Sequence, residues 1–150
     1  MLFLLFQLDQ SRYALDARKV VEVLPLVNLM KLPQAPPGVA GIVNYRGVPV
    51  PALDLSQLML GRPARQRLNT RIILVNYPDN VAGPHLLGLI AERATETVRR
   101  EPSDFVASGV AVPFQGAVAT DIRGLTQWIE VEQLLPASVR GLLFQQSVEH

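Results

Sequence analysis

The chain has 150 residues, of which 49% are hydrophobic and 18% charged, and its formal net charge is +1. This size and composition are typical of one compact globular unit with a sizeable core. The near-neutral charge gives no general attraction to nucleic acid or anionic lipid. Cysteine is absent, which excludes disulfides, thiol nucleophiles and thiolate metal sites.

The chain opens with a predicted β-hairpin, in which apolar runs at 2–8 and 12–15 flank turn-favouring residues at 9–11. The first run has no basic segment before it and meets Asp9 directly, so it indicates a buried strand and not a signal peptide. No other run approaches the roughly 20 apolar residues of a membrane-spanning helix. We therefore expect a soluble cytoplasmic protein with no direct membrane insertion.

The next elements are short and separated by prolines. The β-branched runs 20–24 and 27–32 each end at a proline and predict two strands. A proline-rich loop follows at 33–38, and residues 37–43 fit a short helical turn. Two β-type runs within 41–55 then meet at Arg46-Gly47, a corner that aims a permanent cation outward.

A short helix is predicted up to Leu60, with Asp54 or Ser56 as its N-cap and Gly61 closing it. The polar, arginine-rich segment that follows predicts a division of the chain into two subdomains near 61–69. Further strands are expected at 71–77, 86–91, 95–99, 110–112, 117–122 and 125–129, then a helical turn at 130–135 and a helix at 138–145. So many short strands indicate β-barrels or a sandwich.

The residues around the corner have two expected roles: Arg46 carries the exposed charge, and the others hold the turn in place. Arg46 faces a partner or pairs with a nearby acid, Glu22 or Asp54; the sequence leaves both readings open, and they do not exclude each other. The remaining residues support the turn. Gly47 permits a positive φ, the prolines protect a sheet edge, Asn44 forms loop hydrogen bonds, and Asp54 caps the helix. The supporting set is Gly41, Asn44, Gly47, Pro49, Pro51 and Asp54.

Nothing in the chain has the pattern of a catalytic or metal site. Asp54 is not a receiver-type phosphoacceptor, because the Mg²⁺-binding acid pair and a late lysine are missing and both lysines precede residue 32. His85 has no second histidine at metal-ligand spacing. The serines have no base in a recognisable arrangement. We expect no enzyme activity, no metal and no cofactor.

The corner and its surroundings resemble the CheW-like family, the coupling proteins of bacterial chemosensory arrays. The family pattern is present as Gly41-Ile-Val-Asn44-Tyr-Arg46-Gly47, followed by Pro51-Ala-Leu-Asp54-Leu55. The lead-in Val20-Val21-Glu22 and the runs 71–75, 87–90 and 127–135 are similar too. Two positions depart from the pattern: Glu92 replaces the usual aspartate, and Tyr45 stands where an aliphatic residue is common.

The resemblance implies a single CheW-like domain over 1–150, built as two interlocked five-stranded SH3-like barrels with short helices. It implies a non-catalytic adaptor that joins a chemoreceptor's cytoplasmic tip to the regulatory domain of a CheA-type histidine kinase. The pathway is motility or a paralogous surface-response or second-messenger pathway. The receptor groove is then lined by Val20, Glu22, Arg46 and Ile72, and the free protein is a monomer.

Two other functions remain open. Small barrels often bind nucleic acid, although the neutral charge and the few aromatic residues count against it here. A ligand-binding or enzymatic barrel would need a pocket that brings together at least two of Asp54, Glu22 and His85. A filled barrel interior would count against that reading.

Overall fold

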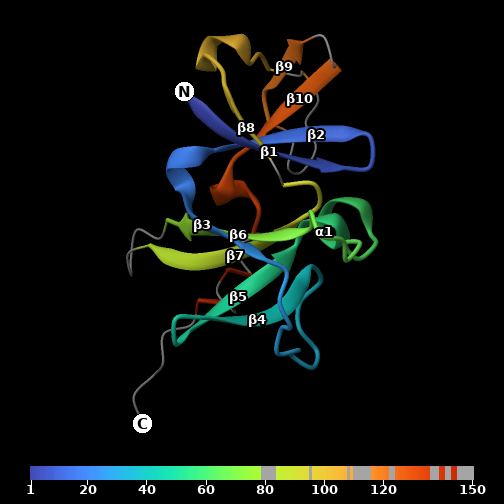
Figure 1. Cartoon of the computed structure of the whole chain (residues 1–150), viewed down its shortest axis with the longest axis vertical. Coiled ribbons are helices and arrows are strands. Elements are labelled where there is room, and N and C mark those ends of the chain that lie inside the picture. The colour runs from blue at the N-terminus through green and yellow to red at the C-terminus, as the bar shows by residue number, and fades with distance from the viewer. Residues whose placement is uncertain are drawn as a thin grey trace.

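Two five-stranded sheets lie one above the other along the long axis of the protein (Figure 1). They are seen in a computed structural model that describes residues 1–78, 84–94, 96–107, 109, 116–121, 124–135, 139–140 and 143–144. The strand expected at 110–112 and much of the helix expected at 138–145 lie outside these ranges.

The first sheet, sheet A, has the order β8-β1-β2-β10-β9. Its strands are β1 (Leu2–Leu8), β2 (Ser11–Asp16), β8 (Glu96–Arg99), β9 (Val118–Asp121) and β10 (Gly124–Ile129). An isolated bridge between Val106 and Val118 brings the chain that follows β8 against β9 at the other edge. This contact curls sheet A into a barrel.

The second sheet, sheet B, has the order β3-β6-β7-β5-β4. Its strands are β3 (Val20–Pro25), β4 (Val39–Tyr45), β5 (Val48–Asp54), β6 (Arg71–Tyr77) and β7 (His85–Ala91). The chain that follows β3 returns to β4 through a bridge between Met30 and Ile42, with N–H···O distances of 2.9 and 2.8 Å. Both sheets therefore close in the same way.

Among the described residues, the named helical elements are short: α1 (Leu55–Leu60) and the 3-10 turns η1 (Ala17–Lys19), η2 (Pro102–Asp104) and η3 (Val131–Gln133). α1 begins after its N-cap Asp54 and ends at Gly61, which has φ 76°. The mainly β class with two five-stranded barrels and short helices is confirmed.

The chain crosses between the barrels at positions that the sequence did not indicate. Strand β2 pairs in parallel with β10, so the N-terminal hairpin belongs with the C-terminal strands. Residues 61–70 connect α1 to β6 within the sheet B half. The sheets therefore do not separate near 61–69. That segment is polar because it lies on the surface of one barrel, not because it links two.

Two local predictions were wrong. Residues 27–32 form no strand beyond the single bridge at Met30. Residues 37–43 are mostly strand β4 and not a helical turn, because Val39 and the β-branched Ile42 and Val43 pair with β5. Proline near the start of the segment favours a helix only where no partner strand competes.

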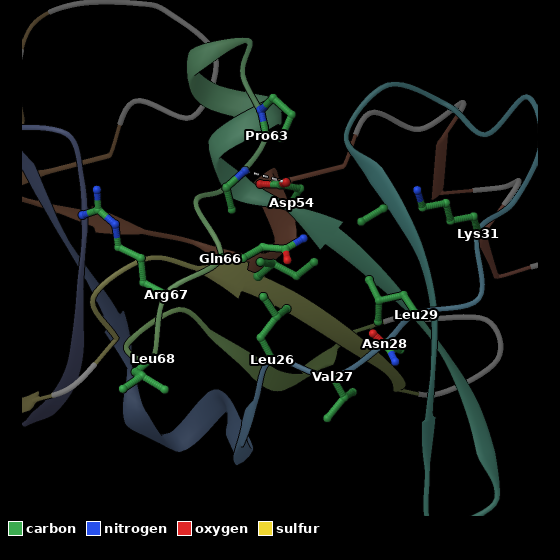
Figure 2. A pocket seen from close by; sticks show the side chains of 13 residues that line it. Leu26, Val27, Asn28, Leu29, Lys31, Asp54, Pro63, Gln66, Arg67 and Leu68 are labelled. Carbon is green, nitrogen blue, oxygen red and sulfur yellow. Dashed lines mark hydrogen bonds between the residues drawn. The ribbon is translucent and has the colours of Figure 1, made fainter.

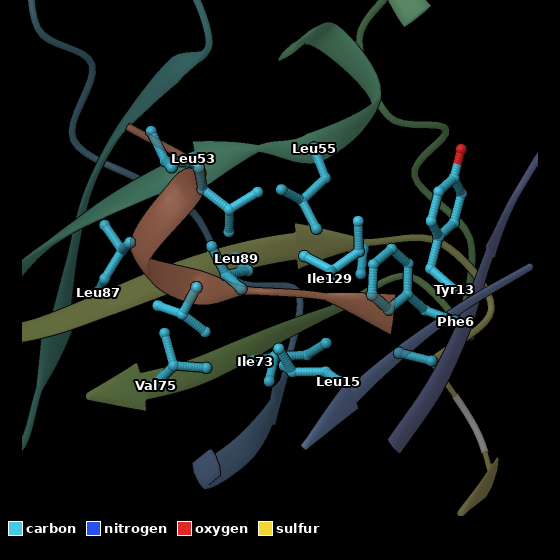
Figure 3. Packing of buried hydrophobic residues seen from close by; sticks show 14 of the residues in the cluster. Phe6, Tyr13, Leu15, Leu53, Leu55, Ile73, Val75, Leu87, Leu89 and Ile129 are labelled. Atoms are coloured by element: carbon cyan, nitrogen blue, oxygen red, sulfur yellow. The ribbon is translucent and has the colours of Figure 1, made fainter. Parts of the chain in front are cut away.

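The main core is shared by both sheets (Figure 3). Phe6 and Leu15 from sheet A meet Ile73, Val75 and Leu89 from sheet B. Burying each such side chain contributes about 1.5–3 kcal/mol before entropy is counted. Separate clusters fill each barrel, with Val43, Val50 and Ile72 in one and Phe3, Phe105 and Trp128 in the other. These filled interiors count against a ligand-binding barrel.

Candidate functional site

The Arg46-Gly47 corner is a two-residue hairpin turn between β4 and β5. Both residues have positive φ, 53° and 84°, which is the requirement of a type I′ turn. The side-chain oxygen of Asn44 accepts a hydrogen bond from the N–H of Gly47 at 2.8 Å. The backbone of the corner is thereby fixed, and the Arg46 side chain extends from it with 75% of its surface exposed.

Glu22, Tyr45 and Arg46 form a cluster at this corner. The Tyr45 hydroxyl donates to Glu22 Oε1 at 2.7 Å, and Arg46 Nη2 lies 3.4 Å from the same oxygen. The Arg46 guanidinium carbon also lies 5.1 Å from the centre of the Tyr45 ring, within the range of a cation–π contact. The hydrogen bond to Glu22 raises the pKa of the Tyr45 phenol. Arg46 therefore pairs with Glu22, as one of the two predicted readings has it, while most of its side chain stays exposed.

The supporting residues of the corner lie on β4, on β5 and at the start of α1. Gly41 packs so closely on the returning chain that a Cβ there would lie 2.4 Å from the carbonyl oxygen of Met30. Pro49 and Pro51 lie opposite Asn44 and Ile42 on β4. Each of these contacts restricts the hairpin that carries the corner.

Asp54 is fully engaged with backbone N–H groups. Its Oδ1 accepts from Ser56 at 3.0 Å and Gln57 at 3.2 Å, and its Oδ2 accepts from Ala64 at 2.9 Å. The carboxylate thus caps α1 and fixes the start of the segment that leads to β6. Both carboxylate oxygens of Asp54 therefore have a structural role.

The other two residues expected in the receptor groove lie elsewhere. Ile72 is completely buried inside the sheet B barrel, where it packs with Val43, Val50 and Ile90. Val20 is partly buried and packs against the shared core. Ile72 therefore lies beneath the surface and does not line it. The structure brings together Glu22 and Arg46 from the predicted set of four.

A second surface feature, which the sequence did not indicate, is an open groove of about 870 Å³ (Figure 2). Its apolar lining includes Leu26, Leu29 and Ile90, and Lys31 and Arg67 stand on opposite sides of it. Leu68 lines it with a fully exposed side chain. The sequence feature that could have indicated this groove is the apolar run after Pro25. In the structure, that run pairs with β4 only at Met30.

Glu92, the departure from the family pattern, holds one wall of this groove. Its Oε2 accepts from Ser56 Oγ at 2.8 Å, Arg62 Nη1 at 2.9 Å and the backbone N–H of Arg65 at 3.1 Å. Burial opposes ionisation of this carboxyl, but these donors outweigh burial, and the pKa of Glu92 is lowered. Glu92 is therefore an internal anchor and not part of the surface chemistry.

The described residues contain no group of three or more potential metal ligands. The imidazole of His85 stacks on Phe144, with ring centres 4.4 Å apart. His85 therefore lies against an aromatic side chain, away from Glu22 and Asp54. Within the same residues, no helix has the length and hydrophobicity to span a bilayer.

Paired SH3-like barrels with filled interiors, an exposed charged corner and an open apolar groove define a protein class that presents binding surfaces. The chain belongs to the CheW-like domain family, whose model matches residues 2–139.

Two relatives and one solved structure are similar to this chain. The chain is 26% identical over 150 residues to chemotaxis protein CheW of Klebsiella aerogenes, covering 99% of this chain and 89% of that protein. It is 29% identical over 126 residues to protein FrzA of Myxococcus xanthus, covering 83% and 73%. The crystal structure of scaffolding protein TtCheW from Thermoanaerobacter tengcongensis shares the fold, with a TM-score of 0.80, 22% identity and coverage of 92% and 89%.

Proposed function

We propose that this chain is a non-catalytic adaptor that couples a chemoreceptor's cytoplasmic tip to the regulatory domain of a CheA-type histidine kinase. One observation carries the proposal: a charged, pre-ordered corner is exposed on barrels whose interiors are filled. Such an arrangement favours contact with macromolecules over conversion of a small molecule. Membership of the CheW-like family supports this class of partner.

The corner is the proposed receptor surface. Val21 and Val48 are exposed apolar residues beside Glu22 and Arg46, on β3 and directly after the turn. Apolar side chains next to an acid and a base seat a helical tip by burial and fix its register by charge. Val20 lies two residues before Glu22 on β3, and Ile72 is buried in the interior of the same barrel.

The groove is the proposed kinase surface. Its apolar lining suits an apolar element of the regulatory domain, and Lys31 and Arg67 suit acidic residues on both sides of that element. A coupling protein needs two surfaces that are occupied together. The corner and the groove lie in different parts of sheet B, so neither partner needs to displace the other.

We infer that the chain acts as one domain over 1–150 and is a monomer when free in the cytoplasm. It associates with membrane-bound receptor arrays through its partners. Individually weak contacts then gain strength in an array, because the first contact raises the effective concentration for the second. The pathway is set by the receptor that it captures, in motility or in a paralogous surface or second-messenger response.

Calorimetric titration with a chemoreceptor tip fragment and the regulatory domain of a CheA-type kinase from the same organism tests the proposal. Wild type should bind both, and Arg46→Glu should lose the receptor tip while keeping the kinase domain. Arg99→Glu is the matched control, because it reverses an exposed arginine on β8 of the other barrel. Failure of wild type to bind either fragment overturns the coupling function. Unchanged receptor affinity in a folded Arg46→Glu variant overturns the receptor surface.

A further inference from the structure

A single side chain, Tyr45, contacts both charges of the corner. Its hydroxyl donates to Glu22 Oε1 at 2.7 Å, and its ring lies 5.1 Å from the Arg46 guanidinium carbon. One side chain therefore orders both the acid and the base of the corner.

The Tyr45–Glu22 hydrogen bond also joins two edges of one sheet. Glu22 lies on β3 and Tyr45 ends β4, and these strands are at opposite ends of the order β3-β6-β7-β5-β4. The Met30–Ile42 bridge closes the same barrel further along β4. Tyr45 consequently fixes the position of the corner relative to β3.

We propose that Tyr45 is the positioning residue of this binding surface and prepares it for a carboxylate on the partner. Glu22 Oε1 receives its short hydrogen bond from the phenol, and the contact of Arg46 with that oxygen is longer, at 3.4 Å. Arg46 is thus held over the ring while 75% of its side-chain surface stays exposed. An exposed guanidinium that is held in one position pairs best with a carboxylate, which it binds through two parallel N–H···O bonds. This inference rests on the proposed function.

The first test uses the free protein. Ultraviolet titration of the phenols should show Tyr45 at a raised pKa in wild type, in keeping with its donation to Glu22. That phenol should disappear in Tyr45→Phe and titrate earlier in Glu22→Gln. A titration curve that Glu22→Gln leaves unchanged overturns the Tyr45–Glu22 contact.

The second test measures affinity for the receptor hairpin fragment by calorimetry. Tyr45→Phe should weaken binding about threefold to tenfold, because it removes one hydrogen bond to a charged group at an exposed site. Tyr45→Leu should weaken it further, since the ring is lost as well. Tyr77→Phe is the matched control: its hydroxyl donates to the carbonyl oxygen of Glu132 at 3.2 Å, away from the corner. That variant should bind like wild type.

A double-mutant cycle separates positioning from direct contact. If Tyr45 acts through Arg46, the effect of Tyr45→Leu on receptor affinity should largely vanish in an Arg46→Ala background. Additive effects overturn the positioning role. Neutralising the acids of the receptor tip one at a time should find at least one that weakens wild type and not Arg46→Ala. Failure to find one overturns the carboxylate assignment.

The outcomes for this inference and for the proposed function are distinct. Unchanged receptor binding by Arg46→Glu overturns the receptor surface itself. A loss of binding by Arg46→Glu, together with wild-type affinity in both Tyr45 variants, overturns only the role of Tyr45. Circular dichroism of each variant establishes that it is folded before its affinity is compared.

Discussion

Arg62 and Glu92 form an ion pair, 2.9 Å between Nη1 and Oε2, and the same arginine also reaches the other barrel. Glu92 follows β7 of sheet B, and Nη2 of the same arginine donates to Asp9 in the β1–β2 turn of sheet A at 2.5 Å. One guanidinium therefore bridges an acid from each half. The same carboxylate of Glu92 holds the segment that forms one wall of the groove.

The first prediction concerns stability. Glu92→Gln should lower the free energy of unfolding by about 2 kcal/mol, because a buried acceptor loses its charge while its three donors remain. Urea unfolding measures this change. Glu132→Gln is the control, since Glu132 is 43% exposed and pairs with Lys19 at 3.3 Å. It should cost well under about 1 kcal/mol. Equal effects of the two variants would show that the Glu92 network is not an anchor.

The second prediction concerns pH. The pKa of Glu92 is lowered in the folded protein from its ordinary value of 4.5, so the folded state binds this proton less readily than the unfolded state. Its contribution to stability is therefore complete above about pH 4.5 and is lost as pH falls through the folded value. The stability difference between wild type and Glu92→Gln should shrink on acidification, measured by urea unfolding at successive pH values. A difference that stays constant down to about pH 3 contradicts this assignment.

The third prediction compares two glycines of the corner motif. Gly41→Ala should cost about 3 kcal/mol or more, because its Cβ would meet the Met30 carbonyl oxygen at 2.4 Å and break the bridge that closes the barrel. Gly47→Ala should cost only the strain of a positive φ, about 1–2 kcal/mol, since nothing lies within 4 Å of its Cβ position. Thermal unfolding of both variants checks the order. A smaller loss for Gly41→Ala would show that the barrel closes without this contact.

Local signals in the sequence predicted the local structure well. The short apolar runs between turn residues predicted most strands within a residue or two. Asp54 and Gly61 bracket α1 because capping depends only on neighbouring residues. The two-residue turn at Arg46-Gly47 is another local effect, since a hairpin of this length needs positive φ at both positions. The identity of the fold followed from the same short motif.

The features that could not be predicted from the sequence depend on contacts between segments that are distant in the chain. The parallel contact of β2 with β10 joins segments more than 100 residues apart, and no local pattern encodes it. Ile72 belongs to a strand buried on both faces, so its apolar character did not distinguish interior from surface. The Tyr45–Glu22 bond and the groove likewise depend on the closure of the sheet B barrel.

The last prediction tests the groove. Leu68 is completely exposed, so Leu68→Ser should leave the free energy of unfolding almost unchanged. If the kinase regulatory domain covers the groove, Leu68 becomes buried on binding, and the substitution should weaken kinase affinity by about tenfold. Leu125→Ser is the control, because Leu125 is 62% exposed on β10 of the other barrel. It should bind the kinase fragment like wild type, and neither substitution should change receptor affinity. Equal kinase affinity of the two variants, measured by calorimetry, would place the kinase contact outside the groove.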